Sequence, residues 1–309
     1  MWKFLRKMML FAAVFYAVSS SYALVVEDQI SPRNCGKHLW ALRQVGHKYD
    51  YAFVGSSRTE MVVDPLIIDS ALGTETVNIG ASGAGAGDQY LLAYHLSSSN
   101  TVKTFVCQID YITVADHFTY AFRDYFWLYC QQDSVTRQVI VDHCGALKYA
   151  AWQLMPALRM MEFSAQYDLH ESSVHWGDSF IKTKGGQQRD EPYDPNRKSS
   201  YATYSPNSLA MTYLQMLITH CQTNNIELIF FQAPFPDSVH EVSEFLKCTE
   251  AIDQLVANNN IEYWDYSDIY KDRKELFYDN HHMNSAGVKV FSEELARRMA
   301  GHHLSRSGQ

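Results

Sequence analysis

The chain has 309 residues, of which 47% are hydrophobic, 14% aromatic and 19% charged. This is the composition of a globular protein, and it excludes a disordered, collagen-like or low-complexity chain. The formal net charge of −8 at pH 7 argues against nucleic acid as a partner, because phosphate contacts need clustered Lys and Arg side chains.

The first 24 residues carry the features of an export segment. Three basic residues, Lys3, Arg6 and Lys7, precede an apolar run over 8–18, and the small residues at 19–23 suit signal peptidase. A cleaved signal peptide and a retained membrane anchor both stay open, because the run is shorter than the roughly 20 residues that cross a bilayer comfortably. Either predicts an extracytoplasmic protein, periplasmic or secreted, with membrane association through the N-terminus if the anchor is retained. We expect one folded domain over 25–309.

Six cysteines are an even number in a chain expected to be exported, where disulfides are permitted. The sequence does not select among their 15 pairings. Buried free thiols are the alternative for Cys107 and Cys221, which lie in apolar runs.

Short apolar runs alternate with segments of helical period along the chain. Runs at 49–54, 76–79, 102–109 and 226–231 predict buried strands, and segments at 88–96, 208–223, 239–258 and 285–300 predict helices. Asn284 is placed to cap the last of these helices. This alternation predicts an α/β fold with a mostly parallel sheet and helices on both of its faces.

The stretch from about 115 to 206 interrupts this alternation. It begins with an aromatic-dense run over 118–129, continues with a helical segment over 146–167, and ends in a polar loop. We expect a helical and loop insertion that caps the carboxyl edge of the sheet. Two roles stay open for its aromatic residues, burial in a core and a platform for ligand stacking.

Ser57 follows the first predicted strand, in the run Gly55-Ser56-Ser57-Arg58. A serine on a tight turn at a strand's carboxyl end is exposed, and nearby amides can face a developing oxyanion. The alternative for such a turn is a helix N-cap.

Asp279 and His282 precede the last predicted helix. An Asp three residues before a His can orient the imidazole and stabilise the imidazolium that forms when the ring takes a proton. A zinc site is disfavoured, because the adjacent His281 and His282 cannot easily both bind one ion and no His-Glu-x-x-His spacing exists. We therefore predict no metal and no cofactor.

Asn78 and Gly80 lie at the end of the second predicted strand, followed by three further glycines at 83, 85 and 87. The spacing matches neither Gly-x-Gly-x-x-Gly nor the Walker motif, which disfavours a nucleotide site. Glycines also let a backbone amide approach a substrate closely.

Taken in order, these three segments resemble the SGNH (GDSL-type) hydrolase family over roughly 49–300, in the extracytoplasmic branch with Gly-Ser-Ser in its first motif. The resemblance implies a three-layer, flavodoxin-like α/β/α fold. It implies Ser57 as nucleophile, His282 as general base and Asp279 as the orienting carboxylate, with His281 as the competing base. The Gly80 amide would join the Ser57 amide in the oxyanion hole, and Asn78 would shape that turn.

The chain departs from the family's third motif, Gly-x-Asn-Asp, whose Asn side chain donates to the oxyanion. The third predicted strand instead reads Val106-Cys107-Gln108-Ile109-Asp110, which leaves open a replacement by Gln108, a different donor or a weak enzyme. Losing one oxyanion donor typically costs about 10²–10³ in turnover.

Three functions follow from the resemblance. The first is an exported serine esterase that removes a small acyl group from a glycan or envelope polymer, or acts on a small ester. The second is an O-acyltransferase that passes the same acyl-enzyme to an envelope polysaccharide. The third is a non-catalytic envelope binding or assembly protein on the same fold, consistent with the missing third motif.

Overall fold

The computed structural model describes residues 1–29, 40–41, 43–115, 133–158, 161, 180–194, 196, 205–237 and 245–307. The chain divides into two compact units. One unit joins Met1–Gly36 with Arg123–Gly177, and the other joins Lys37–Phe122 with Asp178–Gln309. The part of the expected insertion after residue 177 thus belongs to the second unit, which also holds the sheet. That the insertion caps the carboxyl edge stays a prediction.

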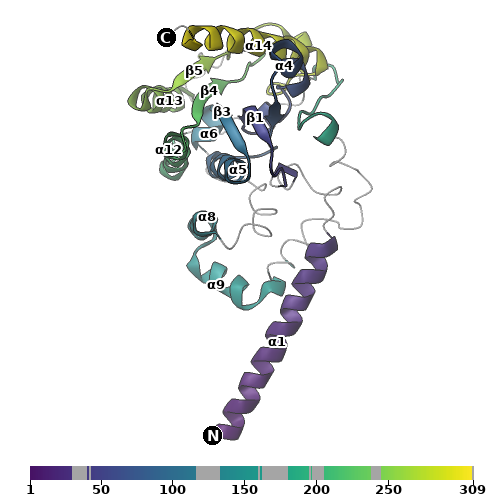
Figure 1. The fold of residues 1–309 in the computed structure, drawn as a ribbon, viewed down its shortest axis with the longest axis vertical. Coiled ribbons are helices and arrows are strands. Elements are labelled where there is room, and N and C mark those ends of the chain that lie inside the picture. Colours follow the sequence, from purple (N-terminus) through teal and green to yellow (C-terminus); the bar gives the residue numbers. More distant parts are fainter. Residues whose placement is uncertain are drawn as a thin grey trace. The chain divides into compact units, whose positions relative to one another are not determined.

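The second unit is built on a five-stranded parallel sheet (Figure 1). Its strands are β1 (Lys48–Val54), β2 (Thr76–Asn78), β3 (Thr101–Gln108), β4 (Glu227–Gln232) and β5 (Glu262–Asp265). They lie in the order β2-β1-β3-β4-β5, and all four neighbouring pairs are parallel. This is the flavodoxin-like order of doubly wound folds, which confirms the predicted fold class. Four strands were predicted, and β5 was not.

Helices cover both faces of this sheet (Figure 1). On one face α4 (Pro65–Leu72) packs against α14 (Ser285–Ser307), and on the other α5 (Ala86–Ser99) packs against α12 (Ser208–Thr223). Other elements that the structure describes in this unit include the helices α6 (Tyr111–Ala115) and α13 (Leu246–Asn259), the single turn α3 (Ser57–Glu60) and the 3₁₀ turn η2 (Lys274–Leu276). Asn284 caps α14 as predicted, because its Oδ1 accepts the amide of Gly287 at 3.1 Å.

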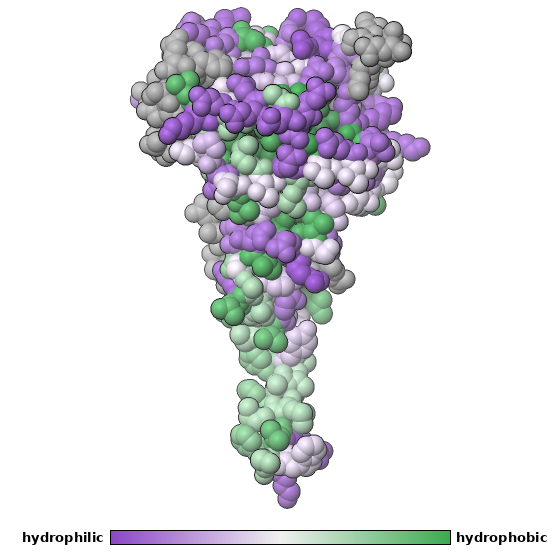
Figure 2. All heavy atoms as spheres, turned by 90° about the vertical axis from the view of Figure 1, so that its left-hand side faces the viewer, coloured by the Kyte–Doolittle hydropathy of each residue, from purple (hydrophilic) through white to green (hydrophobic). Residues whose placement is uncertain are grey.

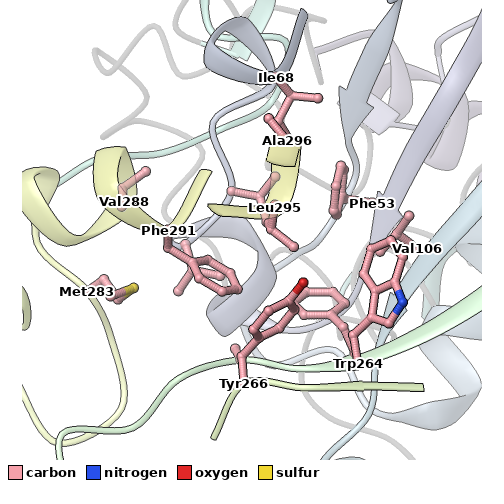
Figure 3. Packing of buried hydrophobic residues seen from close by; sticks show 14 of the residues in the cluster. Phe53, Ile68, Val106, Trp264, Tyr266, Met283, Val288, Phe291, Leu295 and Ala296 are labelled. Carbon is pink, nitrogen blue, oxygen red and sulfur yellow. The ribbon is translucent and has the colours of Figure 1, made fainter. Parts of the chain in front are cut away.

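An aromatic-rich core fills the space between the sheet and the α4–α14 layer (Figure 3). Phe53 of β1 and Phe231 of β4 meet edge to face with ring centroids 6.2 Å apart. Tyr266 and Phe291 meet in the same way at 5.2 Å. This packing fixes the strands relative to α14, whose N-terminal end adjoins the loop that carries Asp279 and His282.

Among the described cysteines, Cys107, Cys221 and Cys248 are free thiols. Burial raises the pKa of Cys221 to about 12 and raises that of Cys107, as the buried-thiol alternative predicts. Cys35 and Cys130 lie outside the described residues.

The first unit contains α1 (Trp2–Gln29), α8 (Ser134–Cys144) and α9 (Ala146–Leu154). Within Trp2–Val25, α1 is long and apolar enough to cross a membrane, a property that signal sequences share. Its large apolar side chains are exposed (Figure 2), whereas Ser19 and Ala23 are buried. Ser19 Oγ accepts the amide of Ala157 at 2.9 Å. The aromatic run at 118–129 lies outside the described residues.

Candidate active site

Ser57 stands on a tight turn at the carboxyl end of β1. Ser56 caps the short helix α3, and its hydroxyl accepts the amide of Arg58 at 3.3 Å. Ser57 is the first residue of that helix and is partly exposed. Gly55 makes the turn tight, because a Cβ at this position would come within 2.7 Å of the Gln108 Cβ. Both interpretations of the sequence therefore hold: the turn is a helix N-cap and also presents a serine hydroxyl.

The loop before α14 brings His282 to this serine. Ser57 Oγ lies 2.8 Å from His282 Nε2, and His282 Nδ1 lies 2.9 Å from Asp279 Oδ2. When Nδ1 carries a proton and donates it to the carboxylate, Nε2 presents its lone pair to the Ser57 hydroxyl. The Tyr278 ring stacks on the imidazole, with centroids 5.3 Å apart and planes 7° apart, and this contact fixes the ring plane.

Asp279 is held as an anion. Burial alone would raise the pKa of this carboxyl group, but the hydrogen bond to His282 and the amides of His281 and His282 outweigh burial and lower the pKa. Both amides lie 2.8 Å from Asp279 Oδ1. The carboxylate therefore stays ionised at neutral pH, as a group that orients an imidazole must.

The structure gives His281 a buried position, with no hydrogen bond to Ser57 among those it describes. Its side chain is buried and meets the edge of the Phe235 ring, with centroids 6.2 Å apart. Burial, with the nearby positive charge of Arg58, lowers the pKa of His281 to about 4. Of the two adjacent histidines, the structure brings His282 to the serine.

The buried side chain of Asn78 holds the turn after β2 through hydrogen bonds. Its Nδ2 donates to the carbonyl oxygens of Thr59 and Val63, both at 2.9 Å. Its Oδ1 accepts the amide of Gly80 at 3.0 Å. The Gly80 amide, expected to face an oxyanion, thus already has a buried acceptor. A role in the oxyanion hole would require this amide to share its proton or to turn away from Asn78.

Three buried polar residues that were not among the predicted site residues lie close to the turn of Ser57. Gln108 ends β3, and its Oε1 accepts the Ser56 hydroxyl at 2.9 Å, while its Nε2 donates to Asp110 at 2.5 Å. Arg58, the residue after Ser57, pairs with the same carboxylate at 2.8 Å. The sequence suggested Gln108 only as a candidate oxyanion donor and predicted no role for Arg58, because arginine side chains are usually solvated.

Within the described part of the chain, no group of three or more His, Cys, Asp and Glu residues is arranged to hold a metal ion. The chemistry that the described side chains can support is nucleophilic attack by a serine hydroxyl, assisted by an imidazole and a carboxylate.

No protein-family model and no curated protein matches the sequence. Similar solved structures include a protein assigned to the G-D-S-L lipolytic family from Desulfitobacterium hafniense DCB-2, with 11% identity and a TM-score of 0.42 over 81% of this chain and 99% of that one. A catalytic mutant of Axe2, an acetylxylan esterase from Geobacillus stearothermophilus, has 11% identity and a TM-score of 0.41 over 82% and 94%.

Proposed function

We propose that the chain is a serine ester hydrolase of the SGNH type that works through an acyl-enzyme. The observation that supports this most strongly is the unbroken hydrogen-bond chain from Asp279 through His282 to Ser57. A nucleophile, a base and an orienting carboxylate in this order are the parts that acyl transfer requires.

In the proposed reaction Ser57 Oγ attacks the ester carbonyl carbon while its proton passes to His282 Nε2. Asp279 stabilises the imidazolium that results. The tetrahedral oxyanion collapses, the bond to the leaving alcohol breaks, and the alcohol takes the proton from Nε2. Water then attacks the acyl-enzyme with His282 again as base, which releases the acid and restores Ser57.

The proposed substrate is a small acyl group on a glycan or cell-envelope polymer, acted on outside the cytoplasm. The exposed apolar surface of α1 and the basic residues Lys3, Arg6 and Lys7 that begin it support export or anchoring. Passing the acyl group to a sugar hydroxyl instead of water would make the same site an O-acyltransferase.

One observation favours the non-catalytic alternative. The Gly80 amide, an expected oxyanion donor, bonds to Asn78. The amide nitrogen of Gln108, the candidate replacement for the missing Asn, bonds to Asp110. A site with few donors for the oxyanion would turn over slowly, and a protein that had lost turnover would still bind an acylated polymer.

Fluorophosphonate labelling of the full chain, with the adduct mapped by peptide mass spectrometry, tests the proposal. We expect an adduct on Ser57 that is lost in His282→Ala and retained in His302→Ala, a matched substitution at a second histidine paired with a carboxylate. Absence of an adduct on Ser57 would overturn the proposal in favour of a binding protein. If Ser57 is labelled, comparing acyl transfer to added glycan with release of free acid separates transferase from esterase.

A further inference from the structure

Gln108 lies beneath the turn that carries the proposed nucleophile. Its side chain is fully buried, and its Oε1 faces three donors. These donors are the Ser56 amide at 3.2 Å, the Ser56 hydroxyl at 2.9 Å and the Thr59 hydroxyl at 3.0 Å. All three belong to residues within two positions of Ser57, so one oxygen atom ties this turn to the end of β3.

Asp110 fixes which way the Gln108 amide faces. Its Oδ2 accepts Gln108 Nε2 at 2.5 Å, and its Oδ1 accepts the amide and hydroxyl of Thr113 at 2.9 and 3.0 Å. An ionised carboxylate is acceptor-only. A reversed amide would set the Gln108 oxygen against this carboxylate and its NH₂ group against the Ser56 amide, so Nε2 faces away from the Ser57 turn.

Arg58 joins this network to the segment that follows β4. Its Nη1 pairs with Asp110 at 2.8 Å, and its Nη2 donates to the carbonyl oxygens of Ala233 and Pro234 at 2.6 and 2.9 Å. The guanidinium carbon lies 3.5 Å from the centroid of the Phe235 ring. Residues on both sides of Ser57 are thus anchored, Ser56 to the end of β3 and Arg58 to the segment after β4.

We propose that Gln108 is a positioning residue that acts on Ser57 through Ser56 and Thr59, and that it does not donate to the oxyanion. The inference rests on the proposed function. A four-residue helix cannot maintain its own geometry, yet Ser57 Oγ must stay within hydrogen-bond reach of His282. A displacement of about 1 Å at a reacting atom can cost about 10²-fold in rate.

Gln232 offers a matched control for a substitution at Gln108. It ends β4 as Gln108 ends β3, it is also buried, and its Oε1 accepts the Tyr263 hydroxyl at 2.9 Å. We expect Gln108→Met to lower both the fluorophosphonate labelling rate and kcat by about 10- to 100-fold with little change in KM. Gln232→Met should leave both rates within about twofold. Equal effects of the two substitutions would overturn the inference.

A double-mutant cycle separates positioning from direct donation. The pair Ser56→Ala and Thr59→Val removes two of the three donors to Oε1 and leaves Gln108 in place, so it also tests the inference if Gln108→Met fails to fold. We expect the Ser56→Ala/Thr59→Val double variant to be labelled as slowly as Gln108→Met, and the triple variant to be no slower than the slower of these two. If the two losses in labelling rate multiplied in the triple variant, Gln108 would act on the oxyanion directly. An unchanged labelling rate in the double variant would exclude the route through Ser56 and Thr59. If the natural chain is not labelled at Ser57, the proposed function itself fails, which is a distinct result.

Discussion

Two histidines paired with carboxylates lie at opposite edges of the same sheet. His282 meets Asp279 at 2.9 Å near the carboxyl ends of the strands. His302 of α14 meets Glu262, the first residue of β5, at 2.8 Å, and Glu227, the first residue of β4, at 3.5 Å. The amino edge also has a cavity of about 690 Å³, lined in part by these two glutamates and His302. By ion-pair distance alone, the two edges look alike.

The two edges differ in the other contacts that the histidine ring makes. The pair at Asp279 uses His282 Nδ1 and leaves Nε2 for Ser57 Oγ. His302 instead points Nε2 at the glutamates and meets the Trp264 ring at 6.0 Å. Open α/β sheets place their sites at the carboxyl ends of the strands. A histidine–carboxylate pair therefore becomes a candidate active site only where a strand end presents a nucleophile to the second ring nitrogen.

Alanine substitution of each histidine gives the largest expected contrast. We expect His282→Ala to lower kcat for hydrolysis of a nitrophenyl ester by about 10⁴-fold, because the base that takes the Ser57 proton is lost. His302→Ala should leave kcat within about twofold. Steady-state kinetics of purified full-length chains measures both. Equal losses in the two variants would show that the Asp279–His282 pair has no special role.

The buried ion pair at the carboxyl edge should also contribute more to the free energy of unfolding than the exposed ion pair at the amino edge. Arg58 and Asp110 are 2.8 Å apart with side chains 2% and 1% exposed, whereas Arg298 and Glu262 are 3.8 Å apart with side chains 55% and 38% exposed. Arg58→Met leaves a buried carboxylate without its cation and should lower the free energy of unfolding by about 3–5 kcal/mol. Arg298→Met should cost about 1 kcal/mol or less. Urea denaturation of both variants would refute this contrast if the two costs were similar.

The lowered pKa of His281 predicts a change in the stability of the protein with pH. This pKa is about 4 in the folded chain and 6.5 as the ordinary value, so the unfolded chain binds more protons between these limits. The free energy of unfolding should therefore fall as the pH drops from 6.5 to 4, by at most about 3 kcal/mol from this group. His281→Gln should flatten this part of the profile in denaturation series at several pH values. An unchanged slope would contradict the buried, neutral state of His281.

The sequence predicted those features that depend on neighbours along the chain. Buried parallel strands read as continuous apolar runs, which located β1 to β4, whereas the four residues of β5 have a mixed pattern of exposure and no such run. Asp279 and His282 are close along the chain, within one turn, so their pairing was also predicted from the local sequence. The Arg58–Asp110 pair joins positions 52 residues apart, so it leaves no local pattern to recognise.

The smallest expected effect is that of a substitution at Glu262, which tests whether its pairing with His302 is only a surface contact. Glu262 accepts the Trp264 indole N–H at 2.6 Å as well as meeting His302, but its side chain is 38% exposed. Water can replace its partners after Glu262→Gln, so we expect a loss of about 1 kcal/mol or less in the free energy of unfolding and no change in kcat. Urea denaturation and ester hydrolysis on the same preparation measure both quantities. If kcat fell while stability held, the amino edge would be coupled to Ser57, and the distinction between the two edges would fail.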